Sequence, residues 1–219
     1  MSEVRHARRW GHTMHLERIH WYGHDAFRIE DDEFQVYIDP WGLPSSAPQA
    51  DLILITHAHH DHYSPEDVAA LAKPGTRVLA PADVAAKIGS SAAAIAPGQT
   101  IRVGSVSVRA VPAYNVDKKF HPQENRWVGY VVTLSDGMTI YHAGDTDHTP
   151  EMDALCGIDV ALLPVSGTYV MKADEALAAA RTFRPRAVIP MHYGKIVGSE
   201  ADAHKFAKCF KGATIIKQP

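Results

Sequence analysis

The segment from Thr56 to His62 constrains this chain more than any other, because residues 57–62 hold four histidines and one aspartate. It follows directly on the apolar run at residues 52–55, which predicts a short buried strand. Imidazole nitrogens and carboxylate oxygens are preferred ligands of zinc and related divalent ions. The spacing His-x-His-x-Asp-His therefore predicts a loop that reaches two metal ions. We expect His57 and His59 at the first ion, Asp61 and His62 at the second, and His60 pointing away.

Length and composition favour one globular domain. The chain has 219 residues, 46% of them apolar, and a net charge of −3 with histidine neutral, so it has no broad basic field for nucleic acid. We predict a single domain over residues 1–219, with a loosely ordered extension over residues 1–15. Two distant cysteines and the lack of an apolar leader or membrane span favour a reducing, cytoplasmic setting. We expect a small-molecule substrate, no nucleic acid and no membrane as partners, and leave a homo-oligomer open.

Apolar periodicity and turn residues predict a mixed α/β layer fold. The first strands, 16–21, 26–29 and 34–38, read as an antiparallel meander, and Ser64 caps a helix that opens at Pro65. Hairpins are predicted to turn at Gly104-Ser105 and at residues 135–137. The remaining predicted strands are 51–55, 77–79, 101–103, 106–111, 128–134, 138–141, 160–165, 187–191 and 213–216, and the remaining predicted helices are 82–88, 174–183 and 201–210.

Metal-binding side chains also follow three other predicted strands. Asp39 comes after strand 34–38, Asp145 after strand 138–141, and His192 after strand 187–191. Loops at strand ends are where a rigid scaffold commonly positions chemistry. We expect Asp145 to bridge the two ions and His192 to complete the second. Taken singly, such residues are more often turn or core groups, so their assignment depends on the 57–62 motif.

These motifs resemble those of the metallo-β-lactamase fold superfamily over nearly the whole chain, from about Leu16 to Ile216. The segments at residues 21–27, 38–41, 141–146 and 189–194 are similar to motifs of a subgroup that includes L-ascorbate-6-phosphate lactonase and N-acyl-phosphatidylethanolamine-hydrolysing phospholipase D. The resemblance implies an αββα sandwich of two mixed sheets flanked by helices. It implies two divalent ions, zinc foremost, with manganese, iron or nickel as alternatives. It also implies that Asp39 holds the histidine loop through hydrogen bonds.

The chain departs from the family pattern at one place. The family has a histidine just after the strand matching residues 108–111, whereas this chain has Tyr114. We predict that the polar loop 115–126 folds back and delivers His121 to the first ion. The alternative is a first site that lacks a protein ligand, with His121 at the surface or against substrate.

Several further residues are candidates for catalysis or substrate binding next to the metals. We name His24 and Tyr193, in addition to Asp61, as catalytic candidates. A packed histidine and a core tyrosine are equally good interpretations of the first two. The same two interpretations, a catalytic donor or a core tyrosine, apply to Tyr169. Lys118 and its neighbours on the long loop could meet an anionic substrate or have no role.

Three functions are compatible with this sequence. The first is a hydrolase that uses a hydroxide held by two metals to cleave a lactone, another ester or a phosphodiester of a small molecule. The second is a mononuclear iron oxygenase that acts on persulfides, against which the presence of Asp61 and His192 argues. The third is a metal-stabilised binding module without catalysis, against which the nearly complete ligand set argues.

Overall fold

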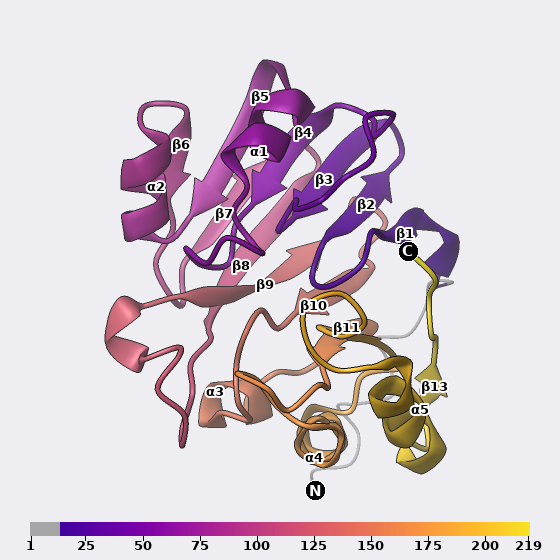
Figure 1. Cartoon of the computed structure of the whole chain (residues 1–219). Coiled ribbons are helices and arrows are strands. Elements are labelled where there is room, and N and C mark those ends of the chain that lie inside the picture. Colours follow the sequence, from indigo (N-terminus) through magenta and orange to yellow (C-terminus); the bar gives the residue numbers. More distant parts are fainter. Residues whose placement is uncertain (1–13) are drawn as a thin grey trace, which may run out of the picture.

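The computed structural model describes residues 14–219, so residues 1–13 of the predicted N-terminal extension lie outside the described part of the chain. Of the other two residues of that extension, Met14 packs against the main core. Two mixed β-sheets pack against each other and helices lie outside them (Figure 1). The predicted αββα sandwich is confirmed.

The first sheet has its six strands in sequence order, with an antiparallel part followed by a parallel part. The first three strands pair antiparallel, which confirms the predicted meander, and the next pairings are parallel. Its strands are β1 (Ile19–Trp21), β2 (Phe27–Asp31), β3 (Phe34–Ile38), β4 (Ala50–Leu54), β5 (Ala72–Ala80) and β6 (Ala92–Ala94).

The second sheet has seven strands in the reverse order, from β13 to β7. Its antiparallel part contains both predicted hairpins, and its parallel part runs from β10 to β13. Its strands are β7 (Thr100–Val103), β8 (Val106–Pro112), β9 (Val128–Thr133), β10 (Thr139–His142), β11 (Val160–Pro164), β12 (Ala187–Met191) and β13 (Ala213–Thr214).

Strand β4 is buried on both faces, as its apolar run predicts. Leu52 and Leu54 point into the core between the sheets, whereas Ile53 belongs to a second core under helices α1 (Pro65–Leu71) and α2 (Ala82–Ile88). The predicted cap of α1 is present, because Ser64 Oγ accepts a bond of 3.1 Å from the backbone N–H of Asp67. Helix α1 therefore begins where the sequence predicts, just after the histidine loop.

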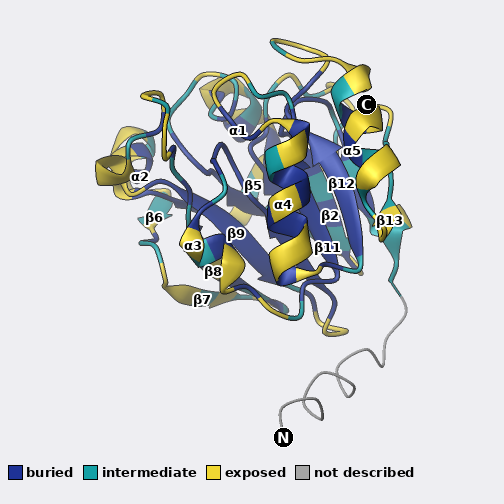
Figure 2. Ribbon diagram, turned by 90° about the horizontal axis from the view of Figure 1, so that it is seen from below, coloured by how far each residue is buried: buried dark blue, intermediate teal, exposed yellow. Residues whose placement is uncertain are grey.

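Helices α3 (Pro150–Asp153), α4 (Ala173–Phe183) and α5 (Glu200–Cys209) accompany the second sheet. Helix α4 turns its buried side toward the strands and its exposed side toward solvent (Figure 2). This division follows from apolar residues at helical spacing, among them Ala176, Ala180 and Phe183. No helix within residues 14–219 is long and apolar enough to cross a membrane.

Three element predictions need correction. Residues Leu16–Arg18 form a short 3-10 helix, because the N–H of Arg18 bonds to the carbonyl of His15 and not to a strand. Strand β5 begins five residues before the predicted Arg77, and β13 ends two residues before the predicted Ile216. Strand β6 and helix α3 were not predicted, since three alanines and a single helical turn give no periodic signal.

Candidate metal centre

The predicted metal-binding side chains meet at one edge of the two sheets. His57, His59, Asp61 and His62 lie in the loop after β4, while Asp145 follows β10 and His192 follows β12. The edge is tied across the sheets, because Tyr130 of β9 donates its hydroxyl to the carbonyl of Ile55 at 2.7 Å. His60 has a side chain that is 83% exposed, and it belongs to none of the groups of possible ligands among the described residues.

One group of possible ligands contains His57, His59, His121 and Asp145, whose candidate ligand atoms lie within 4.8 Å of one another. Nε2 of His57 is 3.1 Å from Nδ1 of His59, and Nε2 of His121 is 3.2 Å from Oδ2 of Asp145. The loop after β8 thus carries His121 into the same group as His57, His59 and Asp145. Three imidazoles and a carboxylate form a ligand set typical of zinc.

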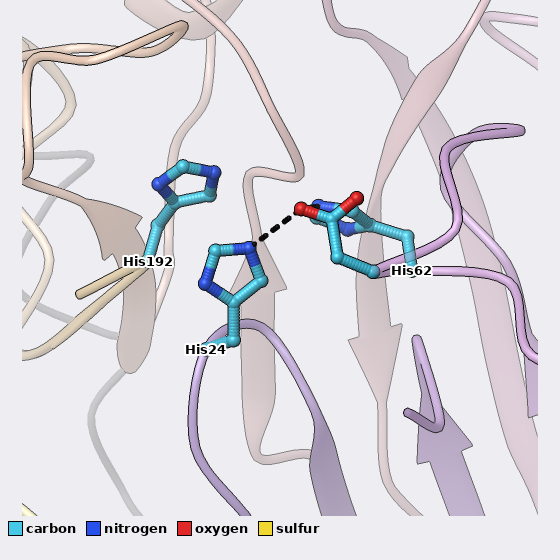
Figure 3. A group of neighbouring side chains, drawn as sticks. His24, His62 and His192 are labelled. Carbon is cyan, nitrogen blue, oxygen red and sulfur yellow. Dashed lines mark hydrogen bonds and ion pairs between the residues drawn. The ribbon is translucent and has the colours of Figure 1, made fainter. Parts of the chain in front are cut away.

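A second group contains His24, Asp61, His62 and His192, again with candidate atoms within 4.8 Å. The rings of His24, His62 and His192 come from three separate segments and lie close together (Figure 3). Nε2 of His24 is 3.0 Å from Oδ2 of Asp61, and its ring centroid is 4.2 Å from that of His192. His24, which the sequence analysis names as a catalytic candidate, is therefore in direct contact with Asp61 and His192.

Asp145 lies between the two groups. Its Oδ1 is 3.3 Å from Nε2 of His62, and its Oδ2 is 3.2 Å from Nε2 of both His121 and His192. Among the described residues, Oδ1 of Asp145 and Nε2 of His62, His121 and His192 are buried without a hydrogen-bond partner. Converging buried atoms without hydrogen bonds cost free energy unless another partner satisfies them, and divalent cations would do so.

A hydrogen-bond chain from Asp39 sets the tautomers of the histidine loop. Oδ2 of Asp39 accepts from Oγ1 of Thr56 at 2.6 Å and pairs with Nδ1 of His62 at 2.8 Å. Since the single hydroxyl proton of Thr56 goes to Asp39, its oxygen must accept from Nδ1 of His57, 2.9 Å away. In their neutral forms both imidazoles consequently carry the proton on Nδ1 and present the lone pair of Nε2 to the centre.

Two further contacts orient the other histidines. Oδ1 of Asn115 accepts from the backbone N–H of His121 at 3.0 Å and lies 3.1 Å from its Nδ1. The amide orientation is fixed, because Nδ2 of Asn115 donates to the carbonyl of Tyr169. His121 therefore also presents Nε2 to the centre. His192 has a partner of its own, because its Nδ1 lies 2.9 Å from Oγ of Ser166.

The backbone is strained at three of these positions. His24, Asp39 and His192 have φ values of +51°, +48° and +59°, in the left-handed region that favours glycine. Each such residue costs on the order of 1–3 kcal/mol and persists only where the surrounding structure holds it. The N–H of His192 bonds to the carbonyl of His24, and that of Asp39 to Leu54, so neighbouring segments hold this geometry.

Burial and mutual charge set the protonation of the groups. Burial lowers the pKa of His57 and His59, which favours the neutral form that binds metals. Burial also acts to lower the pKa of His62, but nearby carboxylates, Asp145 first, outweigh it and raise that pKa well above its usual value. Burial acts to raise the pKa of Asp145, but His192 and His62 hold it well below its usual value. The centre thus holds an ionised carboxylate among histidines.

Asp25 is the residue that the sequence analysis did not single out. It is fully buried, and neither carboxylate oxygen has a hydrogen bond to the described residues. It forms a possible ligand group with His62, Asp145 and His192, and burial raises its pKa well above the usual value. Its position beside His24 in the 21–27 motif was the only available signal.

A cavity of about 290 Å³ opens over the two groups. Its walls are His59, His60, Asp61, Phe120, His121, Asp145, Tyr169 and Ile196. The structure does not bring Tyr193 to this cavity. Tyr193 packs on Trp21 with ring centroids 5.0 Å apart and lines a different cavity of about 190 Å³.

Comparison with known proteins agrees with the class that this fold and site define. Residues 18–192 match the beta-lactamase superfamily domain. A UPF0173 metal-dependent hydrolase of Pyrococcus furiosus is 36% identical over 224 residues, covering 93% of this chain and 97% of that protein. Another, from Methanosphaera stadtmanae, is 34% identical and covers 87% of this chain and 90% of its own length.

Solved structures give the same result. A crystal structure of a Parabacteroides distasonis protein superimposes with a TM-score of 0.83 at 32% identity, covering 91% of each chain. Igni18, a metallo hydrolase of Ignicoccus hospitalis, superimposes with a TM-score of 0.75 at 26% identity, covering 92% of this chain and 94% of its own. The chain therefore belongs to the UPF0173 metal-dependent hydrolase family, within the metallo-β-lactamase superfamily.

Proposed function

We propose that this protein is a hydrolase that works with two divalent metal ions, zinc foremost, on a small-molecule ester, lactone or phosphodiester. The observation that carries the proposal is the convergence of buried, unpaired atoms from His62, His121, Asp145 and His192. The resemblance to the lactonase and phospholipase subgroup and the family membership agree with it. Two exposed free cysteines fit the cytoplasmic setting that we propose.

The ligand sets follow from the two groups. His57, His59 and His121 would hold the first ion, and Asp61, His62 and His192 the second, with Asp145 between them. Two bound ions supply a hydroxide near neutral pH and polarise the oxygen of the scissile group. Two nearly complete ligand sets favour this function over the mononuclear iron oxygenase, which needs only one.

The protein's own residues position the attacking water. Asp61 lines the cavity, and a hydrogen bond with His24 lowers the pKa of its carboxyl against the effect of burial. A carboxylate that stays ionised is a weak base, so we assign Asp61 to accepting a hydrogen bond from the water and thereby orienting it. His24, held by its carbonyl bonds to Trp21 and His192, keeps Asp61 in place.

An activity panel tests the proposal. Protein loaded with zinc, manganese, iron, nickel or cobalt is assayed on esters, lactones and bis-p-nitrophenyl phosphate. We expect turnover that a chelator abolishes, and a loss of about 10²-fold or more in Asp61→Asn. Asp174→Asn, an exposed carboxylate of α4 paired with Lys205, is the matched control. Full activity after metal removal would contradict the proposal, and no turnover with any metal would favour the binding module.

A further inference from the structure

Exposed apolar side chains gather at the mouth of the cavity. Within residues 14–219, the large apolar side chains that remain exposed are Val116, Phe120, Tyr169 and Ile196. Three of the four, Phe120 at 51%, Tyr169 at 37% and Ile196 at 42% exposure, line the cavity over the metal-binding groups. Single exposed apolar residues are ordinary, but their concentration around one cavity indicates a binding surface for apolar matter.

Phe120, Tyr169 and Ile196 together form an apolar wall of the cavity, and one side chain links this wall to the proposed metal site. The rings of Phe120 and Tyr169 meet edge to face with centroids 4.5 Å apart. Asn115, which orients His121, also donates from Nδ2 to the carbonyl of Tyr169 at 2.7 Å. The same side chain thus contacts both the backbone of Tyr169 and a proposed ligand, which ties this part of the wall to the proposed metal site.

Apart from the proposed metal ions, the charges around the cavity do not favour a strongly anionic substrate. Among the described residues that line it there is no lysine or arginine, whereas Asp61 and Asp145 are both present. Lys118, on the same loop as Phe120, is held by Asp147 at 2.5 Å and Asp117 at 3.1 Å. A phosphate monoester dianion would meet no lysine or arginine among the described residues that line the cavity.

We propose that the substrate is an uncharged carboxylic ester or lactone, and that its hydrocarbon portion lies against Phe120, Tyr169 and Ile196. This rests on the proposed hydrolase function and narrows its substrate class. In the reaction, water adds to the carbonyl carbon, the bond to the alkoxy oxygen breaks, and the alkoxide takes up a proton. The products are a carboxylate, an alcohol and one released proton.

Three esters test the proposal by proton release. Methyl acetate has no chain, methyl hexanoate has it on the acyl side, and hexyl acetate has it on the alcohol side. Each buried methylene should raise kcat/KM about fourfold, so an ester whose chain is half covered should have a kcat/KM about tenfold or more above that of methyl acetate. We expect this preference to fall below about threefold in Phe120→Ser and Ile196→Ser. The control Val116→Ser, on the same loop but outside the cavity lining and 65% exposed, should keep it.

Three results would each overturn the proposal. They are an equal kcat/KM for the three esters, a preference for the six-carbon chain that the Phe120 and Ile196 variants retain, and faster turnover of hexyl phosphate than of the esters. Calorimetry of hexanoate and acetate binding to the zinc-loaded protein tests the apolar wall separately from the hydrolase function. We expect hexanoate to bind about tenfold more tightly than acetate, again only with the wall intact. Selective binding without any turnover would refute the hydrolase, and turnover without selective binding would refute the apolar wall.

Discussion

Replacing Asp39 by asparagine should weaken metal binding at the group that contains His62 while leaving the fold intact. The carbonyl oxygen of the new amide must face the N–H of Thr56, which donates to Oδ1 of Asp39 at 2.7 Å. The amide NH2 then faces Oγ1 of Thr56 and Nδ1 of His62. To avoid a clash between two donors, His62 must move its proton to Nε2, the atom aimed at the centre. One charge-assisted bond is lost, which costs about 1.5–3 kcal/mol.

That cost corresponds to a loss of about 10–100-fold in metal affinity, the usual effect of removing a partner of a metal-binding histidine. The assay is zinc titration against a competing chelator, with urea unfolding of both metal-free proteins. Asp31→Asn is the matched control, because Asp31 is also buried and accepts from three donors, on Ser105 and Ser135, without contacting a histidine. Wild-type zinc affinity in a folded Asp39→Asn protein would refute the tautomer argument.

Three further outcomes are expected. Removing the metals should lower Tm by at least about 5 °C, because one ion at a hundredfold excess over its Kd stabilises by about 2.7 kcal/mol; an unchanged scan would argue against bound ions. His121→Ala should reduce bound metal from about two ions to about one per chain, whereas the exposed His204→Ala should not, and a count that stays at two excludes His121 as a ligand. Tyr130→Phe should lower the free energy of unfolding by about 1–2 kcal/mol in urea, because the bond to Ile55 between the sheets is lost; equal stability would show that water replaces this bond.

The local elements and the convergence at strand ends could be predicted because they depend on short patterns. The run at 52–55 implies a buried strand, and the cap at Ser64 ends the loop, so residues 57–62 had to lie between a strand end and a helix. The order of strands could not be predicted from residue pattern. It depends on long-range pairings, such as β10 with β11 and β11 with β12, that no local period encodes.

The side-chain network was beyond sequence reasoning for a different reason. His121 was predicted as a replacement ligand, but its orientation depends on Asn115, six residues earlier in a loop without periodicity. Asp25 gave no signal by itself, because its importance comes from full burial next to Asp145. Tyr193 was named as a possible donor to a developing oxyanion, yet its ring packs on Trp21 and not at the cavity over the two groups.

The most direct test of the two-metal centre is an anomalous difference map of crystals grown with zinc, recorded at the zinc absorption edge. We expect two peaks on either side of Asp145, one next to His57, His59 and His121 and the other next to Asp61, His62 and His192. A single peak, or peaks away from these side chains, would contradict this expectation.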